Sequence, residues 1–208
     1  MFISIEGADG VGKTTQAKLL AEALSHQGYR VACFRDPGST ALGEALRELV
    51  LRRAEIPVGA MAEMLLYMAA RAQLVEEAIR PALAQGSIVI CDRYLLSNVA
   101  YQGYGCGLDI GRLWEIGQFI TGGLLPELTI VLDLPEEMAA LRRKSASDRI
   151  ESRNEEFHRR IRYGFLTEAS KNPDNIVVVD ARPPIPEVHK QILTLIKSRL
   201  ARANQLSP

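Results

Sequence analysis

The stretch "GADGVGKTT" (Gly7–Thr15) follows the apolar run "FISIE" (Phe2–Glu6) and decides the fold. Its spacing matches the Walker A pattern Gly-x-x-x-x-Gly-Lys-Thr, and its context is the expected one, because a strand precedes it and a helix begins at Thr14. Glycines at these positions let backbone N–H groups turn toward phosphate oxygens, and the helix N-terminus adds a partial positive charge. The sequence therefore predicts a binding site for a nucleoside triphosphate.

Two side chains of this loop have direct chemical roles. Lys13 is placed to bridge phosphate groups, and the hydroxyl of Thr14 is placed to bind Mg²⁺. Asp92, at the end of a later apolar run, is the second predicted Mg²⁺ residue and acts partly through water. We therefore expect ATP as a substrate and Mg²⁺ as the cofactor. The predicted ATP-binding residues are Gly7, Ala8, Asp9, Gly10, Val11, Gly12, Lys13, Thr14 and Thr15.

Composition limits the remaining classes of protein. The 208 residues include 25 Lys and Arg and 25 Asp and Glu, so no net charge indicates a nucleic-acid or membrane partner. The three cysteines lack the spacing of zinc ligands, and we expect small core residues with at most one exposed thiol. The N-terminus lacks the features of a signal peptide, and no apolar run approaches about 20 residues. We expect one cytoplasmic domain over residues 1–208.

The apolar pattern along the chain predicts an α/β domain. Five short runs are apolar nearly throughout, which is typical of strands buried on both faces of a parallel sheet. Helical patterns separate them, and this alternation predicts three layers with right-handed crossovers. Pro81 is expected to end or kink the longest helix. The predicted strands are Phe2–Glu6, Arg30–Arg35, Ile88–Asp92, Thr129–Leu134 and Ile176–Asp180, and the predicted helices are Thr14–Ser25, Met61–Leu83, Glu136–Ser145, Asn154–Ser170 and Pro186–Arg202.

Two other users of triphosphates fit the sequence poorly. A GTPase would carry an Asn-Lys-x-Asp motif, and "KNPD" (Lys171–Asp174) has the wrong order. A motor ATPase would usually end an apolar strand in Asp-Glu, whereas "IVICDRY" ends in Asp92-Arg93. Phosphoryl transfer is catalysed mainly by positioning and positive charge, so an arginine here favours a kinase with an anionic acceptor.

Three further stretches complete a resemblance to a known family. They are "FRDPGST" (Phe34–Thr40), "YMAARAQ" (67–73) and "DRYLLSNVAYQG" (92–103). With the Walker loop, they resemble the thymidylate kinase family, the P-loop enzymes that transfer the γ-phosphate of ATP to dTMP. The resemblance runs from Ile5 to about Asp180. It implies a P-loop kinase fold with five parallel strands in the order 2-3-1-4-5, a helical lid, and a homodimer.

The resemblance also assigns the acceptor site. Tyr67 would stack on thymine, Arg71 would donate to its O4, and Asn98 and Gln102 would reach other polar atoms of the base. Tyr101 would lie under the sugar, and three arginines would surround the phosphate. The alternatives are that Tyr67 is a core residue and Arg71 a surface charge, and Arg47 could equally pair with Glu44 or Glu48. The implied dTMP-binding residues are Asp9, Arg35, Arg47, Tyr67, Arg71, Arg93, Asn98, Tyr101 and Gln102.

A carboxylate inside an anion-binding loop needs an explanation. The acceptor is a phosphate monoester with a second pKa near 6, so it needs no general base. We therefore interpret Asp9 as a catalytic support that orients Arg93 or a water bound to Mg²⁺. Members of the family can carry a catalytic arginine in the Walker loop, and this chain has Val11 there. The missing positive charge is then expected from the lid.

The predicted lid spans about residues 141–153, and this range contains a segment of the family pattern Asp-Arg-x-Glu, here Asp148–Glu151. Taken alone, the charged stretch Leu141–Arg162 would be read as a solvated helical hairpin. Lid closure would exclude water and limit ATP hydrolysis. The lid candidates are Arg142, Arg143, Lys144 and Arg149, and the predicted catalytic residues are Asp9, Lys13, Arg93, Arg149 and Arg143.

The sequence departs from the family pattern at two positions, and it leaves two rival functions open. Asp36 and Ser39 replace the commoner residues of "REPGGT", and Ser39 has to adopt a backbone conformation that suits glycine. One rival is another P-loop kinase acting on a different nucleotide or on a deoxynucleoside, for which Glu6 is the available base. The other is a non-catalytic nucleotide-binding regulator, although the chain keeps Lys13, Asp92 and Arg93.

Overall fold

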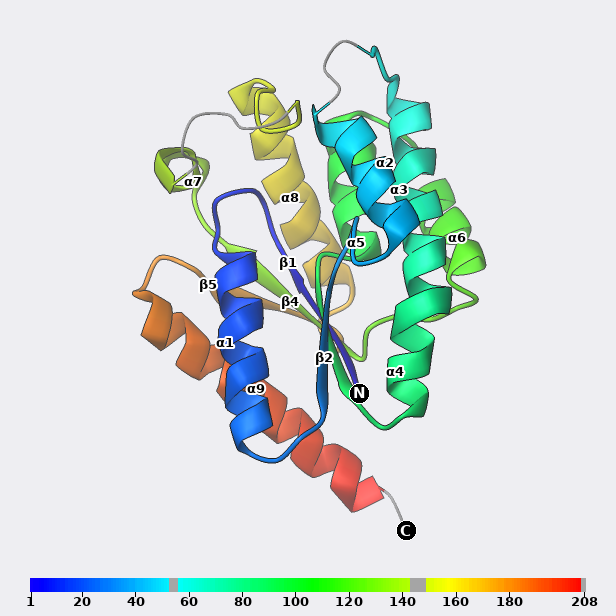
Figure 1. The fold of residues 1–208 in the computed structure, drawn as a ribbon. Helices are drawn as coiled ribbons and strands as arrows, with labels where there is room; N and C mark the ends of the chain where they lie inside the picture. The colour runs from blue at the N-terminus through cyan, green and yellow to red at the C-terminus, as the bar shows by residue number, and fades with distance from the viewer. Residues whose placement is uncertain (53–55, 143–148, 207–208) are drawn as a thin grey trace.

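The structure is a computed structural model, and it describes residues 1–52, 56–142 and 149–206. The strands in this part of the chain form one parallel sheet in the order β2-β3-β1-β4-β5 (Figure 1), so the predicted order is confirmed. The strands are β1 Phe2–Glu6, β2 Val31–Arg35, β3 Ile88–Asp92, β4 Leu128–Asp133 and β5 Ile176–Asp180. The helices are α1 Lys13–His26, α2 Ala41–Arg52, α3 Ala60–Leu74, η1 Val75–Ile79, α4 Arg80–Ala84, α5 Leu95–Asn98, η2 Val99–Gly105, α6 Ile110–Ile120, α7 Glu136–Arg142, α8 Glu155–Lys171 and α9 Ile185–Leu206.

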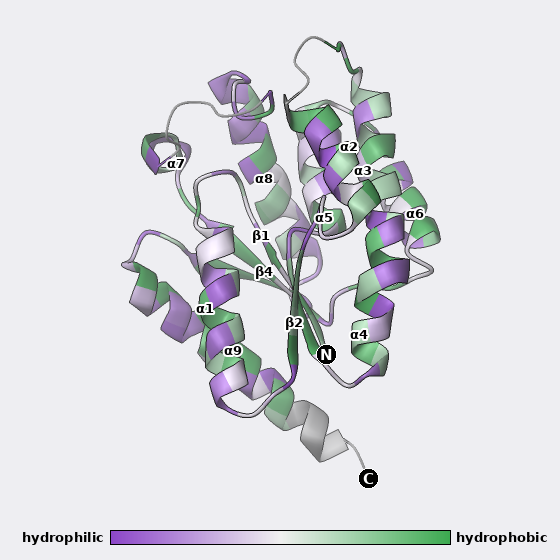
Figure 2. Ribbon diagram, in the orientation of Figure 1, coloured by the Kyte–Doolittle hydropathy of each residue, from purple (hydrophilic) through white to green (hydrophobic). Residues whose placement is uncertain are grey.

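The three central strands form the core. Every residue of β1 and β3 is buried, because helices cover both faces of the sheet. Helix α1 packs against β1, β2, β3 and α9, and α8 packs against β4, β5 and η2. In Figure 2 these strands are coloured as hydrophobic at the centre of the molecule. The predicted three-layer α/β architecture is therefore confirmed.

The two outer strands correct one sequence prediction. We expected all five strands to be buried on both faces, but β2 and β5 are partly exposed. An open sheet has two edges, and an apolar run does not tell which strands lie there. For the same reason Cys33, in β2, is exposed, whereas Cys91, in β3, is buried.

The long predicted helix over residues 61–83 is also different in detail. It is interrupted by a π-helical turn, η1, between α3 and α4. Pro81 lies in the first turn of α4, where its missing N–H is tolerated, so the chain stays helical through it. No helix in the described part of the chain is long and apolar enough to cross a membrane.

The register of the sheet brings the motifs together. Arg35 pairs with Asp92 between β2 and β3, and Ile5 pairs with the same Asp92 between β1 and β3. The loops after β1, β2 and β3 therefore leave the same edge of the sheet. Ligands of open α/β sheets bind outside this carboxyl edge.

Candidate active site

The phosphate loop follows β1 and has the backbone that its glycines predict. Gly7 has φ +132°, and a Cβ there would lie 2.5 Å from the carbonyl oxygen of Leu132 in β4. Gly12 has φ +98° and immediately precedes α1. The Nζ of the buried Lys13 donates to the carbonyl oxygen of Ala8 at 2.7 Å, so the lysine folds back over the loop.

A polar pocket lies beside the loop. Thr14 donates from Oγ1 to Oδ2 of Asp92 at 2.5 Å, so the two predicted magnesium residues are adjacent. These are hard oxygen donors beside the space for phosphate groups, and Mg²⁺ is commonly bound by few protein oxygens plus phosphate and water. Their chemistry therefore fits Mg²⁺. This phosphate pocket is lined by Asp9, Gly10, Gly12, Lys13, Thr14, Thr15, Arg35, Arg47, Asp92, Arg93 and Glu151.

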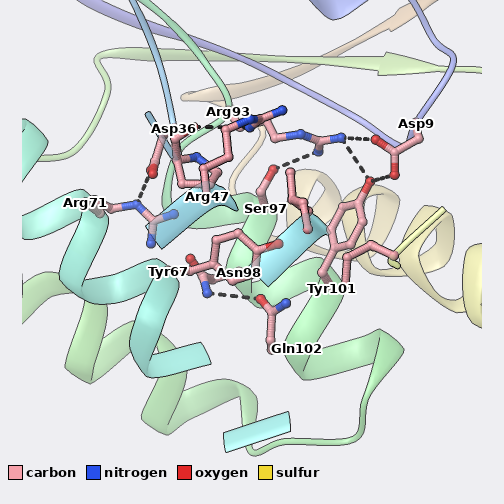
Figure 3. A pocket seen from close by; sticks show the side chains of 13 residues that line it. Asp9, Asp36, Arg47, Tyr67, Arg71, Arg93, Ser97, Asn98, Tyr101 and Gln102 are labelled. Carbon is pink, nitrogen blue, oxygen red and sulfur yellow. Dashed lines mark hydrogen bonds and ion pairs between the residues drawn. The ribbon is translucent and has the colours of Figure 1, made fainter. Parts of the chain in front are cut away.

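A second pocket lies between α3, the α5–η2 segment and the loop after β2. Figure 3 shows the side chains of Tyr67 and Arg71 from α3 opposite those of Asn98, Tyr101 and Gln102. One wall thus carries an aromatic ring and a guanidinium, and the other carries two amides and a second aromatic ring. This acceptor pocket is lined by Asp9, Asp36, Pro37, Arg47, Leu51, Tyr67, Arg71, Arg93, Ser97, Asn98, Tyr101, Gln102 and Ile150.

The two pockets meet at Asp9, Arg47 and Arg93, which line both. Arg93 has φ +71°, an uncommon backbone conformation for a residue with a side chain. Its guanidinium donates to the carbonyl of Gly7 at 3.0 Å and forms an ion pair with Asp9. Tyr101 completes the contact, because its hydroxyl donates to Asp9 at 2.7 Å. Asp9 therefore bonds to Arg93, the first of the two partners that the sequence left open for it.

The two cations at this junction determine the ionisation of Asp9. Burial alone would raise the pKa of Asp9, but Arg93 and Lys13 outweigh it and lower this pKa to about 2. Burial, together with Arg93, lowers the pKa of Lys13 to about 8. Asp9 is thus ionised at neutral pH and is unsuited to act as a base.

Two more arginines face the same space. Arg47 is half-buried and donates to the carbonyl of Pro37 at 3.1 Å, not to an acid of its own helix. Burial and the neighbouring charges of Arg35 and Arg93 lower its pKa. Arg35 pairs with Glu44 at 3.0 Å. Glu44 and Asp9 pair with two of these three guanidinium groups, and together the arginines make the region favourable for an anion.

Comparison with known proteins gives the family. The family described as "Thymidylate kinase" matches residues 5–192. The chain belongs to the thymidylate kinase family. It is 47% identical over 203 residues to a "Thymidylate kinase" of Synechococcus sp. (strain JA-2-3B'a(2-13)), covering 98% of this chain and 97% of that protein. A crystal structure of thymidylate kinase from Ehrlichia chaffeensis has a TM-score of 0.79 and 34% identity, covering 94% and 98% of the two chains.

Within this family fold, Arg71 lines the acceptor pocket, whereas Arg149 differs from the expectation. Arg71 is fully buried, which excludes the alternative of a surface charge; its Nε donates to Oδ2 of Asp36 at 2.5 Å. Arg149 lies away from the phosphate loop, because its guanidinium donates to Glu63 at 2.6 Å and to the carbonyl of Val50 at 3.1 Å. Helix α7 ends at Arg142, and the predicted Arg143 and Lys144 lie outside the described residues.

Sequence reasoning missed part of the site. Asp36, noted only as a departure from the family pattern, holds Arg71, and its own Oδ1 has no hydrogen-bond partner among the described residues. Ser39 does adopt φ +63°, as expected of a position that suits glycine. Glu63 was missed entirely, although it lies four residues before Tyr67 and eight before Arg71, on one helix face.

A further cavity, of about 520 Å³, adjoins the outer side of the phosphate loop. It lies between the loop, the end of α7 and the segment that joins β5 to α9. Arg142 closes one side by donating to the carbonyl of Ala181 at 3.2 Å. The sequence predicted the loop residues of this cavity as part of the ATP site and Arg142 as a lid candidate, but it assigned no residue of the segment between β5 and α9. Its lining is Gly10, Val11, Gly12, Thr15, Gln16, Arg142, Ala181, Arg182, Pro183, Pro184, Ile185 and Val188.

Glu6, the base that a hydroxyl acceptor would require, is not available. It is 0% exposed, and its two oxygens accept from the backbone N–H of Tyr94 at 2.7 Å and from the hydroxyl of Ser97 at 2.6 Å. Burial raises its pKa to about 7. Glu6 therefore holds the segment that follows β3 in place, and it does not reach the acceptor pocket.

Proposed function

We propose that this chain transfers the γ-phosphate of ATP to dTMP and releases dTDP. The observation that carries the proposal is the junction of the phosphate pocket and the acceptor pocket at Asp9, Arg47 and Arg93. A phosphoryl group passing between two bound nucleotides has to cross such a junction. Membership of the thymidylate kinase family supports the choice of dTMP.

The acceptor pocket suits a thymine nucleotide. Tyr67 offers a ring for stacking, and Arg71 is held as a donor for a carbonyl oxygen of the base. Asn98 carries a buried Oδ1 without a partner among the described residues, and thymine offers one ring N–H donor to it. Arg47 and Arg93 are placed at the end nearer the loop, where the 5′-phosphate would lie.

The triphosphate would lie over the phosphate loop. Lys13 and the N-terminus of α1 would bind its β- and γ-phosphates, with the adenosine in the cavity beside Pro183 and Pro184. Thr14 and Asp92 would hold Mg²⁺, which supplies charge neutralisation for the phosphates when bound. Cys33, Cys91 and Cys106 are free thiols, which suits a reducing compartment, and we place the reaction in the cytoplasm.

Catalysis then follows from position and charge. The acceptor phosphate is already ionised near neutral pH, so no residue has to remove a proton. Arg93 would span the acceptor phosphate and the transferring group, held there by Asp9 and by the carbonyl of Gly7. Tyr101, stacked 5.0 Å from the guanidinium of Arg93, limits its freedom and closes the sugar side.

A coupled assay of ADP release tests this function. The acceptors are dTMP, dUMP, dCMP, thymidine and none, each with ATP and Mg²⁺. We expect strong activity with dTMP, weaker activity with dUMP, and none with thymidine. Turnover of thymidine but not dTMP would overturn the phosphate-acceptor assignment, and ADP release without any acceptor would indicate a hydrolase or regulator.

We also propose that the chain acts as a homodimer. Helix α3 packs against α6, and both expose large apolar side chains on the outside, namely Met61, Leu65 and Phe119. Phe119 is 86% exposed, which is unusual for a phenylalanine on a monomer surface. Sedimentation equilibrium should give the mass of two chains, and Phe119→Glu should give one. A single-chain mass for the unchanged protein would reject the dimer.

A further inference from the structure

Glu63, in the first turn of α3, joins three parts of the molecule. It is 0% exposed, so its carboxylate must be satisfied inside the protein. Oε2 accepts from Arg149 at 2.6 Å and from Arg153 at 2.9 Å, both in the last part of the predicted lid. Oε1 accepts from Nε2 of Gln102 at 2.9 Å, in η2.

The hydrogen bonds continue from Gln102 into the acceptor pocket. Nδ2 of Asn98 donates to Oε1 of Gln102 at 3.0 Å, as Figure 3 shows. The chain of donors therefore runs from Asn98 to Gln102 to Glu63. Each amide has one donor end and one acceptor end. Both ends of the Gln102 amide and the donor end of the Asn98 amide are used in these two hydrogen bonds. The Oδ1 of Asn98 remains as a buried acceptor without a partner among the described residues.

The direction of this chain is set by Glu63. An ionised carboxylate only accepts hydrogen bonds, so the Gln102 amide has to present its nitrogen to Glu63 and its oxygen to Asn98. Asn98 must then turn its nitrogen toward Gln102. Reversing either amide would place two oxygens or two N–H₂ groups against each other, at the cost of unpaired buried groups.

We propose that Glu63 is a positioning residue that selects the base. By fixing both amides, it presents Oδ1 of Asn98 to the acceptor pocket as a hydrogen-bond acceptor. Thymine has an N–H donor at N3, whereas cytosine has an acceptor there, so the arrangement accepts the first base and rejects the second. This inference rests on the proposed function and adds to it the residue that determines base selectivity.

The two arginines make the effect of Glu63→Gln predictable. Arg149 and Arg153 carry only donors, so they require an acceptor on the side of residue 63 that faces them. The new amide would turn its oxygen to the arginines and its nitrogen to Gln102. Gln102 and then Asn98 would have to reverse, and the pocket would offer a donor in place of the acceptor.

The test measures kcat/KM for dTMP and for dCMP. We expect Glu63→Gln to lower the value for dTMP about 10- to 100-fold, as for an unpaired buried polar group, and to raise the ratio of dCMP to dTMP at least tenfold. Glu77→Gln is the matched control, because Glu77 is exposed and, among the described residues, bonds to Gln73 alone. It should leave both values unchanged.

Further variants and the unchanged protein distinguish a failure of this inference from a failure of the proposed function. Glu63→Gln combined with Gln102→Glu places an acceptor-only group beside Asn98 again, so the ratio should return toward that of the unchanged protein. If Glu63→Gln does not fold, Gln102→Met should still raise the ratio, because nothing then orients Asn98. An unchanged ratio in a folded variant would overturn the inference, whereas no dTMP activity in the unchanged protein would overturn the proposed function instead.

Discussion

Replacing Arg93 by alanine is expected to lower kcat for dTMP phosphorylation by at least about 10³-fold, the effect typical of an arginine that stabilises a transferring phosphoryl group. Arg93 lines both pockets, as Arg47 does, and it is held in place by Asp9, Gly7, Ser97 and Tyr101. Its guanidinium thus bonds both to the phosphate loop and to the acceptor wall. The measurement is kcat from the coupled assay at saturating ATP and dTMP.

Two control variants distinguish the loss of the positive charge of Arg93 from a general disturbance of the fold. Arg93→Lys keeps the positive charge but loses the planar fork, so it should recover only part of the lost rate. Arg80→Ala removes an arginine that bonds to the carbonyls of Thr121 and Gly122 and lies outside both pockets, so kcat should stay near that of the unchanged protein. Unfolding temperatures show that each variant is folded. A folded Arg93→Ala enzyme within tenfold of the unchanged kcat would contradict the assignment.

The features that sequence predicted well are local ones. The glycine and lysine spacing of residues 7–15 determines the loop because its hydrogen bonds lie within one turn of the chain. Tyr67 and Arg71 line the same pocket because they are four residues apart on α3. The sheet order followed from the resemblance to a family, since strand periodicity alone does not distinguish β2 at an edge from β1 at the centre.

The features that sequence missed depend on contacts between distant segments. The ion pair of Arg71 with Asp36 was not predicted, because Asp36 comes from a distant segment. Arg149 was a candidate lid cation by resemblance to the family, but it bonds to Glu63, 86 positions away in the chain. An ion pair of this kind leaves no period or spacing in the sequence. The role of Glu63 therefore became visible only when three segments were placed together.

Replacing Lys13 by methionine is expected to lower kcat/KM for ATP by at least about 10²-fold, because a fixed positive donor to the phosphates is lost while the length of the side chain is kept. Lys18→Met is the matched control, since Lys18 lies on the exposed side of the same helix and should be neutral. Steady-state rates at varied ATP give the comparison. A folded Lys13→Met enzyme within a few-fold of the unchanged protein would show that the loop backbone suffices.

The pH dependence gives Lys13 a second, independent signature. Its pKa in the free protein is lowered to about 8, first by burial and then by Arg93. Above that pH the amine is neutral, so kcat/KM for ATP should fall about tenfold for each further unit of pH, since this parameter reports the free enzyme. Bound phosphates favour the charged amine, so kcat at saturating ATP should begin to fall only at higher pH. Lys13→Arg should lose the fall near pH 8, because a guanidinium stays protonated there. A fall that persists in Lys13→Arg would have to come from another group.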